Sequence, residues 1–114
     1  MTEKELVDLV IEETGGMLDH PFNGGTSHEK IEWQVIRHRR NRKIIAMVFT
    51  KDGVLLIDLK MIPEHGEFAR KLRGVMPGYH MNKTHWNTVD VNHTDVQPQE
   101  LVGMIRESSK LTEK

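Results

Sequence analysis

The 114-residue sequence contains no cysteine. This absence excludes disulfide bonds, zinc sites built on thiolates and a cysteine nucleophile. Long apolar runs are also missing, since Ile44–Phe49 and Val54–Ile57 have only the length of strands. A membrane-spanning helix needs roughly 18 or more apolar residues. Because the charged start Met1–Glu5 also lacks the apolar run of a secretory signal, we expect a cytoplasmic protein with no membrane contact.

The composition is that of a folded globular chain. Hydrophobic residues make up 37% and charged residues 29% of the sequence, which argues against disorder. The length is that of one domain, and no repeat, linker or low-complexity tract interrupts it. We therefore expect a single domain over residues 1–114.

The formal net charge of −1 hides an uneven distribution of charge along the chain. Residues 1–32 hold eight acids and two bases, whereas residues 33–89 hold eleven bases and four acids. A local positive field attracts anions even on a protein that is neutral overall. The middle of the chain is therefore where a binding surface for anions is expected.

The spacing of apolar residues, together with capping and turn residues, predicts the helices and strands. A Thr2/Glu5 capping box opens a helix over residues 3–13, and Gly15-Gly16 ends it. Residues 17–30 have loop composition. Alternation predicts a strand at 31–35, a run with apolar residues on both faces predicts a second at 43–50, and the turn Lys51-Asp52-Gly53 introduces a third at 54–60. Their connections are too short for crossovers, so the three should form an antiparallel meander. Pro63 opens a short helix that should bury Phe68, Ala69 and Leu72. Residues 86–91 are expected to form a strand. The last helix should start at Gln97 and direct four apolar side chains inward: Leu101, Met104, Ile105 and Leu111. This order predicts an α+β fold with an antiparallel sheet flanked by helices.

One segment is dense in functional side chains: Pro77-Gly78-Tyr79-His80-Met81-Asn82-Lys83-Thr84-His85-Trp86-Asn87-Thr88-Val89. It resembles the PGYHMNKxHWNTV motif of the MmcQ/YjbR-like family. His20-Pro21-Phe22, and Leu59-Lys60 leading into Pro63-Glu64, agree with that family less strongly. The resemblance extends over roughly residues 3–110. It implies a frataxin-like (CyaY-like) α+β fold and, mainly through the family's name, DNA binding, but no established activity.

Five permanent cations lie between residues 37 and 43, where a turn between two strands is expected. They are Arg37, Arg39, Arg40, Arg42 and Lys43. Guanidinium groups bind phosphate with two parallel donors, so this hairpin predicts contact with DNA or another phosphate-bearing ligand. We expect Lys83 and His85 to add positioned contacts. The alternative is an ordinary polar turn whose charge discourages aggregation of the sheet. No helix has the composition of a major-groove reader.

A second hypothesis places a small-molecule or anion site, with catalysis left open, at Tyr79, His80, Asn82, Lys83 and His85. The purely structural alternative packs Trp86 and Tyr79 in the core and uses Asn82 and Asn87 to satisfy the turn, and we expect Trp86 and Val89 to be core residues. No nucleophile elbow, phosphate loop or dinucleotide fingerprint is present, so we expect a binding module rather than an enzyme. His80 and His85 are five residues apart, which is not metal-ligand spacing on a helix, and we expect neither metal nor cofactor. A protein-interaction domain is the third possibility, and the sequence indicates no oligomeric state.

Overall fold

The N-terminal helix is built as its capping residues predict. The computed structural model describes residues 1–19 and 31–114. Helix α1 (Glu3–Thr14) starts after Thr2, whose Oγ1 accepts from the Glu5 amide at 3.2 Å while the Glu5 carboxylate accepts from the Thr2 amide at 2.8 Å. It ends at Gly15, which has φ +70° and therefore adopts the left-handed conformation that glycine tolerates best.

The centre of the sheet is the predicted antiparallel meander. It consists of β2 (Gln34–Arg37), β3 (Ile44–Lys51) and β4 (Val54–Lys60). Asp52 and Gly53 join β3 to β4 with φ values of +52° and +78°, the pattern of a two-residue turn that matches strand twist. The predicted strand bounds agree with the structure to within three residues.

Two short strands were not predicted. β1 (Met17–Asp19) pairs with β2, and β5 (Val75–Pro77) pairs with β6 (Trp86–Asp90), giving the antiparallel order β1-β2-β3-β4-β6-β5. The expected loop at 17–30 is therefore wrong at its start, since three residues are too few to show an alternation. The rest of that expected loop, with the family agreement at His20–Phe22, lies outside the described residues. β1 and β5 form the two edges of the sheet.

Helices α2 (Pro63–Ala69) and α3 (Pro98–Thr112) both place a proline in their first turn. The inward residues predicted for α3 are confirmed for Leu101, Met104 and Ile105, whereas Leu111 is 37% exposed. In α2 the prediction for Phe68 is wrong, because its side chain is 67% exposed. The helix instead packs through Gly66 and Ala69, where an added Cβ at Gly66 would lie 2.9 Å from Asn87 Nδ2. So close an approach leaves no room for a larger side chain on that face.

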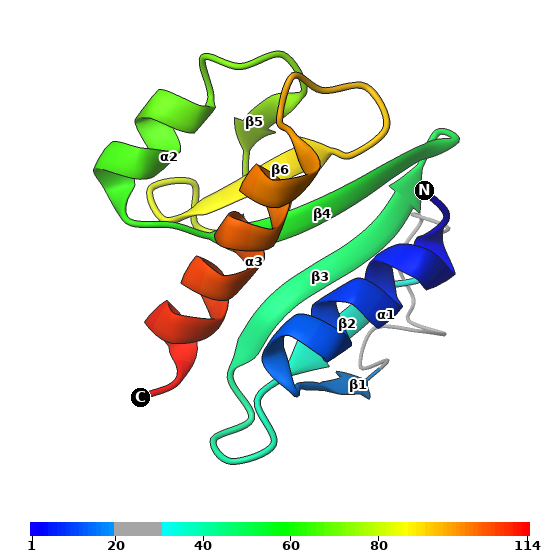
Figure 1. Ribbon diagram of the computed structural model, residues 1–114, viewed down its shortest axis with the longest axis vertical. Helices are drawn as coiled ribbons and strands as arrows, with labels where there is room; N and C mark the ends of the chain where they lie inside the picture. Colours follow the sequence, from blue (N-terminus) through cyan, green and yellow to red (C-terminus); the bar gives the residue numbers. More distant parts are fainter. Residues whose placement is uncertain (20–30) are drawn as a thin grey trace.

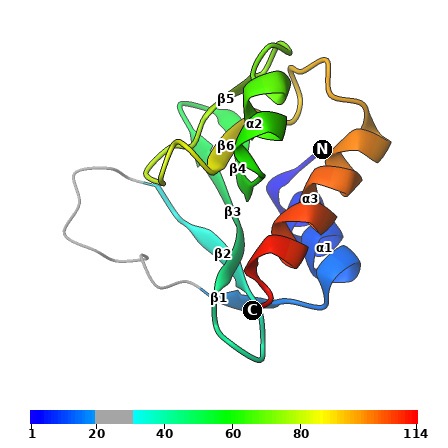
Figure 2. The same cartoon turned by 90° about the vertical axis from the view of Figure 1, so that its left-hand side faces the viewer.

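The helices cover one face of the sheet, and the two views show α1 and α3 side by side on it (Figures 1 and 2). The main core lies between these helices and the sheet, and it includes Ile57, Leu59 and Val89. A second, smaller cluster lies on the opposite face, formed by Trp33, Val35, Met47, Phe49 and Leu56. Trp86 and Val89 are buried, at 8% and 0% exposure, as the structural interpretation of the motif predicted. The helix-free face is the one that the motif segment approaches.

Candidate functional site

The basic hairpin, residues 37–43, connects β2 to β3 and projects from the end of the sheet (Figure 1). Its tight turn is closed by the Arg42 amide, which donates to the His38 carbonyl at 3.0 Å, and Arg42 has φ +65°. Arg37 at its base is half-buried, and its Nε donates to Asp19 Oδ2 at 3.0 Å. A second donor of Arg37 reaches the Arg42 carbonyl at 2.8 Å. Arg37 therefore holds the hairpin in shape.

Several hairpin side chains bind the carboxyl ends of two helices. Asn41 Nδ2 donates to the Thr112 carbonyl at 2.9 Å, and His38 Nε2 lies 2.9 Å from the Ser109 carbonyl at the end of α3. Arg39 Nε donates to the Gly15 carbonyl, just past α1, at 3.2 Å. Helix carboxyl ends carry unpaired carbonyls and partial negative charge. Some of the hairpin side chains thus stabilise the fold by binding the ends of these helices. Lys43 also donates to the Lys114 carbonyl.

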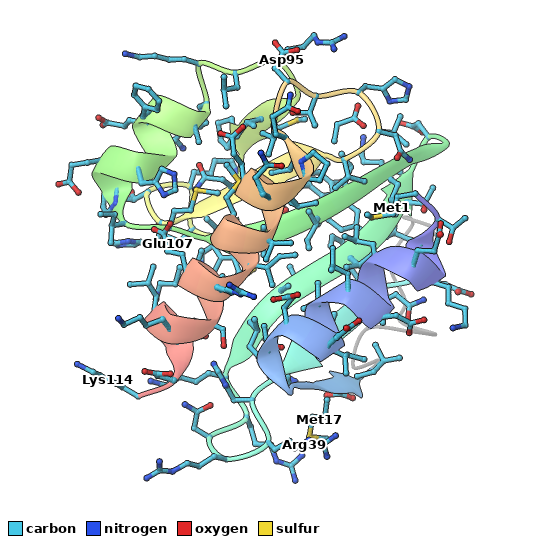
Figure 3. The ribbon with its side chains drawn as sticks, viewed as in Figure 1. Met1, Met17, Arg39, Asp95, Glu107 and Lys114 are labelled. Atoms are coloured by element: carbon cyan, nitrogen blue, oxygen red, sulfur yellow. The ribbon has the colours of Figure 1, made fainter. Side chains whose placement is uncertain are left out.

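Two of the five predicted cations face solvent with no such role. The guanidinium groups of Arg40 and Arg42 are exposed and form no hydrogen bond or ion pair with any described residue. Next to them is an open hollow of about 620 Å³, lined by His38, Arg40, Asn41, Glu113 and Lys114. Arg39 and Lys114 are labelled at this end of the molecule in Figure 3. Of the hairpin cations, the two without a partner among the described residues therefore lie at its tip.

The motif loop, residues 78–85, joins β5 to β6 and is held by short internal bonds. Gly78 donates to the Trp86 carbonyl at 2.9 Å, and a Cβ at Gly78 would lie 2.7 Å from that of Trp86. Lys83 Nζ donates to the Gly78 carbonyl at 2.9 Å. Asn82 Oδ1 accepts from the Thr84 amide at 2.8 Å, and the His85 carbonyl accepts from Met61 at 2.8 Å. Much of the motif therefore specifies the shape of the loop.

Beneath the motif loop lies a buried carboxyl group, that of Asp58. Leu55, Ile57 and Leu59 of β4 belong to the helix-side core, so alternation directs Asp58 to the other face. It pairs across the sheet with Thr88, whose hydroxyl donates to Asp58 Oδ1. Thr88 Oγ1 in turn accepts from the Tyr79 amide at 2.9 Å, so the loop is bonded to the carboxyl group through one hydroxyl.

The environment of Asp58 changes its ionisation. Its side chain is fully buried, and Oδ2 has no hydrogen-bond partner among the described residues. Burial raises the pKa of Asp58 to about 7, because desolvation penalises the charged form. The Thr88 hydroxyl, the Tyr79 amide and the nearby charges of His80 and Lys83 act against this rise and lower that pKa. A carboxyl group of this kind exchanges its proton near neutral pH.

Aromatic rings gather beside Asp58 on the same face. The Tyr79 ring lies 6.1 Å from Trp33 and 5.7 Å from Phe49, measured between centroids. His80 lies 4.2 Å from Tyr79 and has φ +59°, an uncommon backbone conformation for a residue other than glycine. Lys51 Nζ lies 5.4 Å above the Tyr79 ring. The motif therefore places one half-buried and one exposed ring over a buried acid.

The structure brings together some of the predicted residues and separates others. Tyr79, His80 and Lys83 gather around Asp58, which the sequence analysis missed. The basic hairpin lies well apart from the motif loop in both views, so Lys83 and His85 do not join the hairpin cations in one local site (Figures 1 and 2). A signal for Asp58 was present, since it is an acid in the centre of an apolar strand.

Residues 1–19 and 31–114 contain no group of three or more His, Asp or Glu side chains arranged to hold a metal ion. Within the same residues, no helix has both the length and the apolar character needed to cross a bilayer.

The fold is an antiparallel sheet backed by helices on one face, with a buried acid beneath the motif loop on the other. The family model described as YjbR matches residues 21–111, and the chain belongs to this family. The resemblance expected from the motif is thereby confirmed.

Two proteins with solved structures share the fold of nearly all of this chain. A crystal structure of a Pseudomonas syringae protein has a TM-score of 0.83 at 30% identity, covering 98% of this chain and 99% of that one. Deinococcus radiodurans protein DR2400 has a TM-score of 0.72 at 28% identity, covering 96% of this chain and 77% of that one. "Uncharacterized protein YyaQ" of Bacillus subtilis (strain 168) is 26% identical over 122 residues, 98% of each chain. These likenesses confirm the predicted α+β class.

Proposed function

We propose that the protein binds the phosphate backbone of nucleic acid through the tip of the basic hairpin. The observation that supports this most directly is the exposure of Arg40 and Arg42, whose guanidinium groups have no partner among the described residues. A guanidinium group offers a planar pair of donors that fits two phosphate oxygens. Lys114, which lines the same hollow as Arg40, adds exposed positive charge there. Contacts to phosphate position a protein without reading sequence, so binding of this kind has no base preference.

The test is fluorescence anisotropy with a labelled DNA duplex and the matching single strand. The variant Arg40→Ser/Arg42→Asn removes both free charges, and Asn suits the left-handed conformation of residue 42, at φ +65°. We expect its affinity to fall by about tenfold or more, and the slope of log affinity against log salt to weaken by about 2, between roughly 50 and 200 mM salt.

The matched control is Lys71→Ser/Arg73→Ser, which removes two exposed cations from the segment between α2 and β5. That segment lies at the opposite end of the molecule from the hairpin (Figure 1). Affinity should change little in this control. Absence of binding by the parent protein at low salt, or an equal loss in both double variants, rules the proposal out.

The motif loop supports a second candidate, the binding of a small anionic ligand with a flat ring. The specific observation is the strained backbone of exposed His80 beside the Tyr79 ring, because strain of this kind concentrates at ligand sites. Tyr79 and His80 would stack on the ring, and Lys83 would neutralise the anion. Asn82 and His85 of the predicted site act mainly through loop shape in this arrangement.

A thermal-shift screen against nucleotides, inorganic phosphate and carboxylates tests the second candidate. A ligand that binds only the folded state raises the melting temperature. We expect a nucleotide to raise the melting temperatures of the parent protein and of Lys71→Ala equally. It should raise the melting temperature of Lys83→Ala by less than half as much. An undiminished response of Lys83→Ala excludes the loop as the binding site.

A further inference from the structure

The open hollow beside the hairpin tip contains a titratable ring in addition to its permanent charges. Its volume of about 620 Å³ lies in the range of small-ligand sites. Arg40 of the hairpin and Lys114, just past α3, bring two cations to its lining, and Glu113 brings one carboxylate. His38 and Asn41 complete that lining. The charge of the hollow therefore depends on whether His38 carries a second ring proton.

One ring nitrogen of His38 is held as a hydrogen-bond donor. Nε2 lies 2.9 Å from the Ser109 carbonyl and 2.9 Å from Thr112 Oγ1. A carbonyl oxygen can only accept, and the Thr112 hydroxyl donates its own hydrogen to the Ser108 carbonyl at 2.7 Å. Nε2 must therefore carry the hydrogen of the neutral ring, and the lone pair lies on Nδ1.

The other nitrogen, Nδ1 of His38, is open to a ligand. It has no hydrogen-bond partner among the described residues. It is also not sealed, because the sealed and unpaired side-chain atoms of residues 1–19 and 31–114 are Asp58 Oδ2 and Asn87 Oδ1. In the neutral ring, the Nδ1 lone pair repels the oxygens of an anion. After uptake of a proton, Nδ1–H donates to those oxygens and adds a positive charge.

The charged groups around the ring couple its protonation to the binding of an anion. In the empty hollow, Arg40 and Lys114 disfavour a further positive charge, whereas Glu113 favours it. The carbonyls at the end of α3 favour a cation as well. A phosphate group in the hollow adds negative charge beside the ring, so phosphate binding and proton uptake strengthen each other.

We propose that the hollow holds one phosphate group of a nucleic-acid strand, bound by Arg40 and by the Nδ1–H of protonated His38. This inference rests on the proposed function, to which it adds a place for the phosphate and a dependence on pH. A phosphodiester keeps its single negative charge near neutral pH, so the proton is taken up by the ring. The bound state then holds more protons than the free state, and affinity rises as the pH falls from roughly 8 to 5.

The pH dependence of affinity for the labelled duplex tests this inference at fixed salt. We expect the parent protein to bind about fivefold or more tightly at about pH 6 than at about pH 8. His38→Gln keeps an amide donor for the Ser109 carbonyl but cannot take up a proton. Its affinity should equal that of the parent at about pH 8 and change by less than about twofold at about pH 6.

The matched control is His93→Gln. It removes an imidazole whose side chain is 71% exposed, beside Asp90 and after β6, and so tests the general gain of positive charge on acidification. This variant should keep the full pH response of the parent. A pH response that His38→Gln also keeps overturns the inference.

The ring nitrogen NMR signals of His38 give a second measurement, which needs no substitution. They should show the Nε2–H tautomer in the free protein at about pH 8 and move toward the imidazolium form when duplex is added at about pH 7. Signals that stay unmoved at saturation overturn the inference, and this measurement decides if His38→Gln distorts the hairpin. Binding that is equally strong at both pH values overturns this inference alone, whereas absence of binding overturns the proposed function with it.

Discussion

At the scale of single residues, the main finding is an acid within an apolar strand. Asp58 follows Val54-Leu55-Leu56-Ile57 in the sequence, and a strand of such composition is normally buried. The unusual position of this acid can be seen in the sequence, but its hydrogen-bond partner cannot. Thr88 lies 30 residues further along the chain, and only the β4–β6 register brings the hydroxyl to the carboxyl group.

The raised pKa of Asp58 predicts a pH dependence of stability. The folded state holds its proton up to about pH 7, whereas the unfolded chain releases it near the ordinary value of 3.8. The folded state therefore binds more protons in this window, and the free energy of unfolding falls as pH rises. From about pH 5 to pH 8 we expect the parent protein to lose about 1 to 3 kcal/mol relative to Asp58→Asn.

Urea denaturation of both proteins across this pH range measures the difference. The two curves of unfolding free energy against pH should diverge steadily and run parallel above about pH 7. Parallel curves over the whole range would show that Asp58 ionises normally. Asp90→Asn makes the same chemical change on β6 and serves as the matched control, so its curve should follow that of the parent.

At the scale of elements, the basic hairpin has a structural role that its composition did not reveal. All five cations were predicted to form a phosphate-binding surface, yet Arg37, Arg39 and Lys43 contact groups of the fold itself. The carbonyls concerned lie 24 to 71 residues away in the sequence for Arg39, Asn41 and Lys43. Contacts over such distances depend on the packing of α1 and α3, which local patterns do not encode.

Removal of one hairpin contact should therefore loosen α3. Asn41→Ala loses the bond to the Thr112 carbonyl and the bond from the Lys43 amide to Asn41 Oδ1. We expect the free energy of unfolding to drop by about 1 to 2 kcal/mol, and the last turn of α3 to exchange its amide hydrogens faster. Arg40→Ala at the neighbouring position should stay within about 0.5 kcal/mol of the parent. Equal stability of the two variants would assign no structural role to Asn41.

At the scale of the whole molecule, the sequence predicted the α+β class, the meander and all three helices, because each has a readable period or cap. It missed β1 and β5, which are three residues long, and it placed Phe68 inside although α2 packs through Gly66. The family motif identified the right loop but not the acid beneath it. The separation of that loop from the basic hairpin follows from the strand order and the twist of the sheet, and neither can be read from charge along the chain.

The lengths of the strands have a consequence for self-association. The eight-residue β3 and seven-residue β4 lie in the interior of the sheet, while each margin is only three residues long. Pro77 further removes one amide donor from the β5 margin. A strand from another molecule could pair with only three residues at either edge strand. Such short edges disfavour the growth of the sheet by edge-to-edge pairing.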